Sequence, residues 1–371
     1  MVNLSSKPAS EKFTSIGGQA VIEGVMMRSP NAFVVAVRKP DGVIRLRRDQ
    51  WYGLNKRFNI FKKPLLRGIL ILVETMANGI VSLNYSAHIA MNEELKQEAL
   101  KKGISEEDFL AQQKNKEKVG WATFFSIVAS FIFGILLFVF LPHGLTALIE
   151  RWVGESWGLQ SFLFHAIDGI IKATVFILYV YIIGFFPDIK RVFQYHGAEH
   201  KAISTFEAKE ELTVENAQRY STFHPRCGTT FIFFLLLISI ILFTGIFVIV
   251  PVGVGQPLII KHLMAILFKI ALTFPIAGIS YELIKILGKN STSVWGRMMS
   301  APGMMLQRLT TREPDDQQVE VALASIKAVL FLEERHGLKS ADQKILEQDE
   351  LDISSATDIE LTMLKPDDFK E

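Results

Sequence analysis

The segments Tyr195-His-Gly-Ala-Glu-His200 and His224-Pro-Arg-Cys-Gly228, which lie between long apolar runs, decide how this sequence is interpreted. If the first segment is helical, His196 and His200 lie one turn apart on one face, about 6 Å along the axis. Glu199 faces the same side. Two imidazoles at this spacing can hold a divalent ion with a carboxylate beside it as a general base. H-x-x-E-H is also the inverzincin pattern.

The second segment adds two candidate ligands. Cys227 is the chain's single cysteine and lies three residues after His224. Imidazole and thiolate donors favour zinc. Four protein ligands would close the site and make it structural, whereas three leave a position for catalysis. The alternative is that His196, Glu199 and His200 only pair with one another at a membrane surface.

The composition indicates a membrane protein. The 371 residues are 49% hydrophobic, with mean hydropathy +0.27, and the charges collect between long apolar runs. One cysteine excludes an internal disulfide and fits a reduced compartment or a metal ligand. The first sixty residues hold no apolar run resembling a signal peptide. The net charge of +2 says little about partners. We expect a bilayer, a membrane-protein partner or lipid-linked substrate, and no nucleic acid.

A small β-containing cytoplasmic domain is predicted over residues 16–55, after a disordered segment 1–15. Residues 33–38 and 43–48 flank Lys39-Pro-Asp-Gly42 and read as a β-hairpin. Glu23 and Arg28, in a glycine-rich stretch, are either functional charges or a surface ion pair.

Residues 56–119 are predicted to hold a polar membrane-associated helix and a charged cytoplasmic helix. The apolar stretch 65–91 carries Glu74 and Asn78 near one stripe, which is costly against lipid. The stripe is either satisfied by packing or contacts a ligand. The stretch could span, lie at the interface or re-enter.

Residues 120–290 are predicted to form a four-span membrane domain with a cytoplasmic His/Cys loop at 188–229. The spans are 121–141, 164–186, 231–250 and 258–286. Asp168 and Lys172, at i and i+4, could pair with each other. Intramembrane Asp168, Lys172, Lys269 and Glu282 are candidate functional charges, although either lysine could instead snorkel to the surface.

The distribution of basic residues predicts the topology. Residues 142–161 carry one arginine and the loop 251–257 carries no basic residue, whereas the other connections are rich in lysine and arginine. The positive-inside rule then places both termini and the His/Cys loop in the cytoplasm of a multi-pass cell-membrane protein. With four spans, residues 65–91 must begin and end on one side.

Residues 291–337 are predicted to form a cytoplasmic interface segment and a helix, followed by a disordered acidic tail over 338–371. Thr311 is the expected N-cap, and Glu313, Asp315 and Asp316 complement the positive helix end. A metal or catalytic role for one of these acids is the alternative. The helix has an apolar face, formed by Val319, Ala322, Leu323, Ile326, Val329 and Leu330.

Four motifs together resemble the YqhQ-like bacterial membrane proteins. They are G-G-Q-A-V-I-E-G-V-M-M-R (17–28), Y-H-G-A-E-H-K-A-I (195–203), H-P-R-C-G-T (224–229) and L-T-T-R-E-P-D-D (309–316). The resemblance covers about residues 15–335. It implies a domain of unknown function that is sometimes described as a predicted metal-dependent enzyme.

Three functions are consistent with these patterns. The first is a metal-dependent hydrolase at the cytoplasmic membrane face, with Glu199 as general base, acting on a peptide, ester or phosphoester in a lipid-linked or membrane substrate. The second is a non-enzymatic membrane-protein biogenesis or scaffold factor with a structural metal. The third is a transporter that uses the intramembrane charges, which the lack of an evident internal repeat disfavours.

Overall fold

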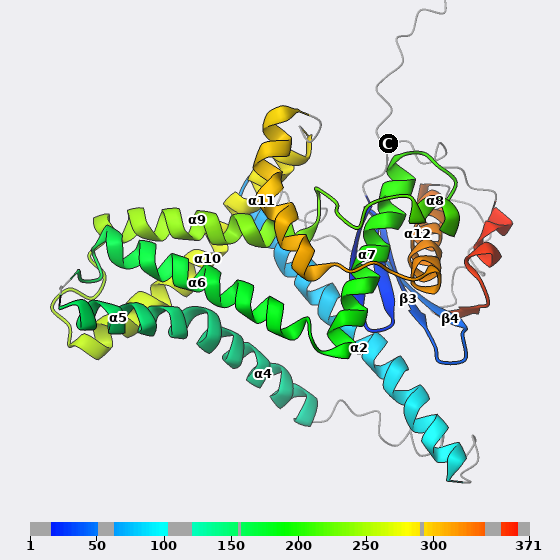
Figure 1. The fold of residues 1–371 in the computed structure, drawn as a ribbon, viewed down its shortest axis with the longest axis horizontal. Coiled ribbons are helices and arrows are strands. Elements are labelled where there is room, and N and C mark those ends of the chain that lie inside the picture. Colours follow the sequence, from blue (N-terminus) through cyan, green and yellow to red (C-terminus); the bar gives the residue numbers. More distant parts are fainter. Residues whose placement is uncertain are drawn as a thin grey trace, which may run out of the picture.

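The computed structural model describes residues 16–50, 63–102, 121–154, 157–289, 293–337 and 350–362. It consists of an apolar helical bundle beside a sheet covered by helices (Figure 1). The elements are β1 (Gly17–Val21), β2 (Gly24–Arg28), β3 (Ala32–Arg38), β4 (Ile44–Gln50), α2 (Leu66–Lys101), α4 (Trp121–Ile135), η2 (Leu136–Phe140), α5 (Leu141–Val153), α6 (Phe162–Ile183), α7 (Pro187–Glu207), α8 (Val214–Gln218), α9 (Gly228–Ile249), α10 (Leu258–Lys289), α11 (Val294–Thr310), α12 (Asp316–Gly337), β5 (Glu350–Ile353) and η4 (Ala356–Thr362).

The sheet is an antiparallel meander in the order β1-β2-β3-β4-β5. The predicted hairpin is confirmed: β3 pairs with β4 from Ala32↔Gln50 to Arg38↔Ile44. Gly42 closes the turn at a φ of +89°, which glycine adopts without steric cost. The strands are short and apolar on both faces, so the sheet must be covered on both sides to be stable.

Helices from distant parts of the sequence cover the two faces. On one face, Val25, Val34 and Leu46 pack in a buried core with α7 and α12. On the other face, Val35 and Val37 pack with Tyr85 and Ile89 of α2. The predicted domain over residues 16–55 is therefore incomplete, because its core depends on three helices that follow it in the chain.

The tail contributes the fifth strand. Disorder was predicted over residues 338–371, but β5 pairs with β4 from Ile44↔Ile353 to Arg47↔Glu350. Arg45 Nε donates to Asp352 Oδ1 at 2.7 Å, and Lys39 Nζ lies 3.2 Å from Asp352 Oδ2. The prediction was wrong for these residues because their acidic side chains pair with basic side chains of β4 and of the turn before it. Residues 1–15, 338–349 and 363–371 lie outside the described residues.

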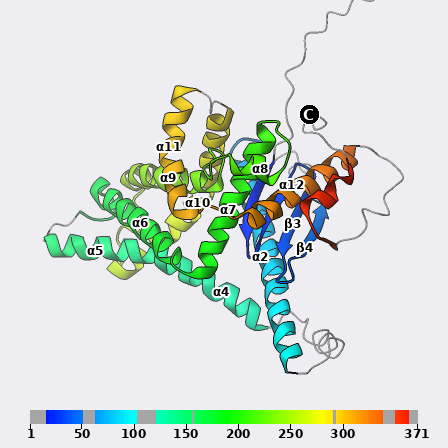
Figure 2. The ribbon, with the colours of Figure 1, turned by 45° about the vertical axis from the view of Figure 1, so that its right-hand side comes forward.

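The bundle holds α4, α5, α6, α9 and α10, which lie together away from the sheet in both views (Figures 1 and 2). Large apolar side chains on these helices are exposed, among them Phe133, Ile170, Ile241 and Ile259. By length and composition, five helices could cross a membrane: Leu66–Met91, Phe125–Val153, Phe162–Ile183, Gly228–Ile249 and Leu258–Ile286. Apolar surface on this scale identifies a membrane protein.

Two predicted boundaries in this region change. The first expected span does not end at residue 141, because α4, η2 and α5 run on without a break to Val153. Pro142 stands in the first turn of α5, where its missing N–H costs little. Residues 66–91 of the predicted polar stretch belong to the unbroken helix α2, so no turn divides them. Of the predicted charged helix, residues 92–101 continue α2, and 103–118 lie outside the described residues.

The helix predicted after residue 310 is confirmed as α12, with a different cap. Asp315 accepts from the Gln318 backbone N–H at 2.8 Å, and Gln318 Oε1 accepts from the Asp315 N–H at 3.0 Å. This reciprocal arrangement is a capping box. Thr311 is not the N-cap, because its hydroxyl donates to Gln307 O and ends α11. The predicted apolar face is buried against the sheet.

Candidate metal centre

Helix α7 carries the first half of the centre. It begins with Pro187 at its first turn and Asp188 near its positive end, both favourable at a helix start. The segment Tyr195–His200 is helical, as the two-histidine arrangement requires. His196 and His200 point from the same side of α7, with their ring centroids 4.5 Å apart.

Each histidine is held by a backbone carbonyl through Nδ1. His196 Nδ1 lies 2.9 Å from Thr310 O, and His200 Nδ1 lies 2.5 Å from Thr222 O. A carbonyl oxygen can only accept, so each Nδ1 carries the hydrogen when the ring is neutral. Both Nε2 atoms are then left with a lone pair, which is the state that a metal ligand needs. Burial lowers the pKa of His200 and keeps it neutral.

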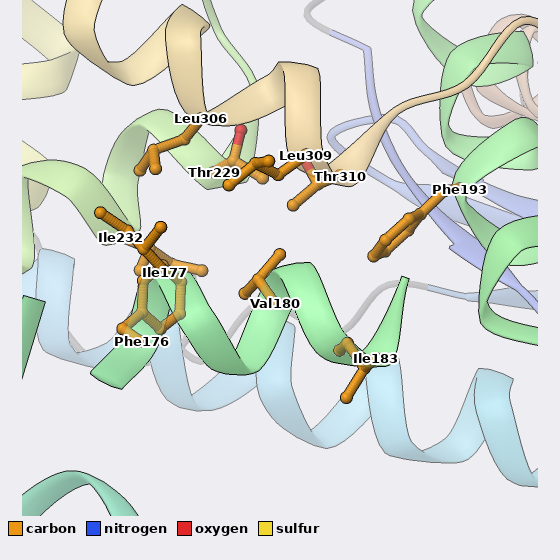
Figure 3. Close-up of a pocket in the computed structure, with 10 residues that line it drawn as sticks. All are labelled: Phe176, Ile177, Val180, Ile183, Phe193, Thr229, Ile232, Leu306, Leu309 and Thr310. Atoms are coloured by element: carbon orange, nitrogen blue, oxygen red, sulfur yellow. The ribbon is translucent and has the colours of Figure 1, made fainter. Parts of the chain in front are cut away.

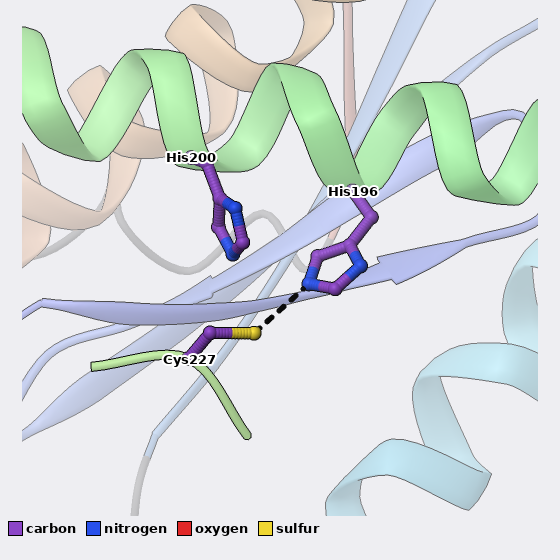
Figure 4. Close-up of side chains that lie close together, drawn as sticks. All are labelled: His196, His200 and Cys227. Atoms are coloured by element: carbon purple, nitrogen blue, oxygen red, sulfur yellow. Dashed lines mark hydrogen bonds between the residues drawn. The ribbon is translucent and has the colours of Figure 1, made fainter. Parts of the chain in front are cut away.

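Cys227 completes the group from the opposite side (Figure 4). Its Sγ lies 3.1 Å from His196 Nε2, and the ligand atoms of the three side chains lie within 4.8 Å of one another. Burial raises the pKa of the Cys227 thiol, but interaction with His200 and hydrogen bonds with Thr229 outweigh it, so the net shift is downward. Within the described part of the chain, these side chains form the only group able to offer three ligands.

His224 is not part of this group. Its Nδ1 accepts from the Arg226 backbone N–H at 3.4 Å, and its Nε2 faces Glu207 Oε2 at 3.4 Å. Glu207 also pairs with Arg226. Both ring nitrogens of His224 are thus directed to other partners. The prediction of a four-ligand set that includes His224 does not match this geometry, because a nearby carboxylate orients the ring.

Glu199 lies beside the centre, between α7 and β1. Burial, together with the nearby Cys227 sulfur, raises the pKa of the carboxyl to about 8, although His196 and a hydrogen bond from the Gly18 backbone favour its ionised form. One of its oxygens, Oε2, is buried without a hydrogen-bond partner, as is His200 Nε2. A Cβ at Gly18 would come 2.9 Å from Glu199 Cγ, so glycine makes room for this side chain.

The donors around the centre are suited to zinc. Two imidazoles and a thiolate are typical zinc ligands, and the unpartnered His200 Nε2 would gain a partner on binding an ion. Thr222 and Thr310 could not be identified from the sequence, because their contacts with the two rings are made by backbone carbonyls of other segments. Thr229 lies only two residues after Cys227, so its contact with the cysteine could have been inferred from the sequence.

The candidates in the sheet, in α2 and before α12 are engaged in structural contacts. Glu23 forms an ion pair with Arg191 and accepts from Tyr195 Oη at 3.3 Å. Arg28 Nη1 donates to Thr75 Oγ1 at 3.3 Å, and Glu74 lies close enough to act on its charge. The acids before α12 have separate roles: Glu313 pairs with Lys201, Asp315 caps α12, and Asp316 accepts from Gln218.

The predicted charges of the membrane helices form two sets. Asp168 forms its salt bridge with Lys269 of α10 at 2.8 Å rather than with Lys172, the partner that the i, i+4 spacing allowed. Lys172 instead lies 4.9 Å from the centre of the Phe243 ring. The interhelical pair was not visible in the sequence because it joins residues about one hundred positions apart. Glu282 forms an ion pair with Arg67 of α2.

The chain is thus a helical membrane protein with a sheet-based unit that holds a His/His/Cys group. Residues 63–331 match the model of the family described as "Protein of unknown function (DUF1385)", and the chain belongs to this family. It is 35% identical over 326 residues to "Uncharacterized protein YqhQ" of Bacillus subtilis (strain 168), which covers 85% of this chain and 92% of that protein. The family resemblance read from the motifs is confirmed. No solved structure matches the chain.

Proposed function

We propose that the protein is a zinc-dependent membrane hydrolase with His196, His200 and Cys227 as ligands and Glu199 as general base. The observation that carries the proposal is the three-ligand geometry, in which His224 is turned toward Glu207. Three protein ligands are typical of catalytic zinc, because the fourth position stays open for the reaction. Structural zinc sites, in contrast, almost always have four protein ligands.

The chain's own residues supply the remaining chemistry. Zinc in such a site polarises a carbonyl or phosphoryl oxygen and makes water a better nucleophile. Thr310 and Thr222 hold the imidazoles in orientation, as carbonyl partners do in other metal sites. Glu199, whose Oε2 has no partner, would be the base: a cation bound beside it would favour the carboxylate over the protonated form of the metal-free site, and the carboxylate could then take a proton from water. The reaction class is hydrolysis of an ester, phosphoester or peptide.

The fold supports a cytoplasmic location for the centre, with four crossings. The sheet packs with α7 and α12, so residues 16–50 and α7 lie on one side of the membrane. Helix α6 ends on the side of the sheet and therefore begins on the opposite side of the membrane. The continuous helix α4–α5, which precedes α6, ends on that opposite side, so residue 121 at its start is again on the side of the sheet. Helix α2 must therefore begin and end there. Its contacts with both the sheet and α10 fit a helix at the membrane surface, and the positive-inside rule makes that side cytoplasmic.

Metal analysis of purified variants tests the proposal. The wild-type protein should contain about one zinc per chain, and His196→Ala or His200→Ala should lose it. His224→Ala is the matched control and should retain zinc, because its ring is directed to Glu207. Zinc loss in this control, or a wild-type protein without metal after loading with zinc, contradicts the assignment.

A second experiment tests the base. Glu199→Gln should keep the zinc while its cells accumulate the unprocessed substrate, which comparative lipid mass spectrometry detects against wild type and a null strain. If Glu199→Gln restores the wild-type lipid profile fully, Glu199 is not the base.

A structural-metal factor is the second candidate. The observation in its favour is that the centre joins three segments, since His196 binds Thr310 at the end of α11 and Cys227 caps α9. A metal here would pin α7, α9 and α11 together and contribute folding energy. Under this alternative, removing zinc lowers the melting temperature strongly, and Glu199→Gln is without effect. Under the hydrolase proposal, Glu199→Gln abolishes function in a folded, zinc-loaded protein.

A further inference from the structure

An apolar cavity of about 140 Å³ lies beside the candidate metal centre, between the bundle and α7 (Figure 3). Its wall is formed almost entirely by aliphatic and aromatic side chains, from α6, α9, α11 and the first turns of α7. Those used below are Ile177, Val180, Phe193, Ile232, Leu306 and Leu309. An apolar cavity of this kind does not hold water well, because water finds no hydrogen-bond partners there.

The cavity and the centre share a wall. The two polar residues that line the cavity are Thr229 and Thr310. Thr310 O accepts from His196 Nδ1 at 2.9 Å, and Thr229 Oγ1 donates to Cys227 Sγ at 3.3 Å. An apolar group in the cavity is therefore separated from His196 only by Thr310, and from Cys227 only by Thr229.

The dimensions and the surroundings indicate the occupant. A cavity of about 150 Å³ accommodates one benzene molecule, so 140 Å³ fits a short stretch of a single hydrocarbon chain. A helix, about 10–12 Å across with its side chains, is too wide. Ile177 is 42% exposed on α6, a helix able to span the membrane, so the wall reaches the lipid-facing surface. A lipid chain can then enter sideways from the bilayer.

We propose that this cavity binds one hydrocarbon chain of a membrane lipid and places the lipid's polar linkage at the His/His/Cys centre. This inference rests on the proposed function and narrows its substrate class to lipids cleaved near the head group. The cavity holds the end of the chain nearest the linkage, and the remainder lies along α6 in the bilayer. Selection arises because a fused-ring group near the linkage, which is much larger than benzene, exceeds the volume of the cavity.

Photolabelling tests the inference. The full-length, zinc-loaded protein is placed in nanodiscs of phosphatidylethanolamine and phosphatidylglycerol that contain a phospholipid with a diazirine near the carboxyl end of its acyl chain. After irradiation, mass spectrometry should locate the label on Ile232 of α9 and on Leu306 or Leu309 of α11. Val180→Trp fills the cavity and should reduce this labelling at least fivefold.

The matched control is Leu178→Trp, on the same helix. Leu178 is 51% exposed and does not line the cavity, so its replacement should leave labelling of α9 and α11 unchanged. If Val180→Trp fails to bind zinc and does not fold, Ile232→Trp is used with labelling of α11 as the readout. Equal labelling in the filled and control variants, or label spread evenly over all bundle helices, means annular lipid only and overturns the inference.

The test separates this inference from the proposed function. If wild-type protein lacks zinc but the cavity is labelled selectively, the lipid site stands and the metal assignment fails. If zinc is bound by His196, His200 and Cys227 but labelling is not selective, the metal assignment stands and the lipid site fails.

Discussion

Gly197 offers a decisive test of how α7 is fixed beside the rest of the fold. It lies between the centre's His196 and Glu199, where α7 passes close to the segment after α11. A Cβ built on Gly197 would come 2.2 Å from Arg312 O and 3.1 Å from Thr222 Cγ2. Contacts under 3.0 Å are essentially never seen, and the nearest neighbour here is backbone. One of the two segments must therefore move by about 1 Å.

Two effects of Gly197→Ala oppose each other. In a helix interior, alanine is about 1 kcal/mol more favourable than glycine. Overpacking costs about 1–3 kcal/mol, and a clash with a backbone oxygen belongs at the upper end. We therefore expect the free energy of unfolding to fall by about 2 kcal/mol. For a cooperative unit of about 150–250 residues, this lowers the melting temperature by about 4–8 °C. Displacement of the Arg312 region also disturbs the Thr310 carbonyl that holds His196, so zinc content should fall.

The assay is thermal unfolding in detergent, with zinc measured on the same samples. Gly245→Ala is the control, because Gly245 is also helical but a Cβ there meets nothing within 4 Å. This variant should unfold at or above the wild-type temperature. If Gly197→Ala melts as high as Gly245→Ala and keeps its zinc, the close packing of α7 against residue 312 is refuted.

Three further predictions concern contacts away from the centre. Lys269→Met leaves Asp168 buried without its partner and should lower the free energy of unfolding by about 3–5 kcal/mol. The double variant that adds Asp168→Asn should recover most of this loss in thermal unfolding. If it recovers nothing, the two residues do not form a direct pair. Asp352→Asn should loosen β5, seen as faster proteolysis of the tail at neutral pH. The Arg45 hydrogen bond holds the pKa of Asp352 at about 2, below its ordinary 3.8. Protection of the wild-type tail from proteolysis should therefore be complete above pH 4 and fall as the pH drops toward 2. Protection that rises on acidification would contradict this pH dependence. Glu333→Ala should destabilise by about 1–3 kcal/mol in the same unfolding assay, because three hydrogen bonds tie its carboxylate to the β2–β3 turn; an unchanged midpoint would show that the turn is held without it.

The sequence was informative where the physical cause is local. The hairpin around Gly42 follows from its turn chemistry, and the apolar face of α12 follows from the helical period. The convergence of Cys227 with His196 and His200 was anticipated because few residue types bind zinc. In contrast, neither the rotation of His224 toward Glu207 nor the docking of β5 on β4 has a local signal. Both depend on side chains that only the folded chain brings together.

The covering of the sheet by later helices has a consequence for biosynthesis. Strands β1–β4 are translated first, but β5 follows about 300 residues after them, which at roughly 5–20 residues per second means a delay of about 15–60 s. Helix α2, which covers the face around Val35, begins only 16 residues after β4, but the face around Val25 lacks α7 and α12 until they are synthesised much later. Helix α7 reaches the sheet only if the preceding helices have been inserted in the correct orientation. Completion of the sheet unit thus reports on correct insertion, and a chain with an inverted helix would keep an exposed sheet that chaperones and proteases recognise.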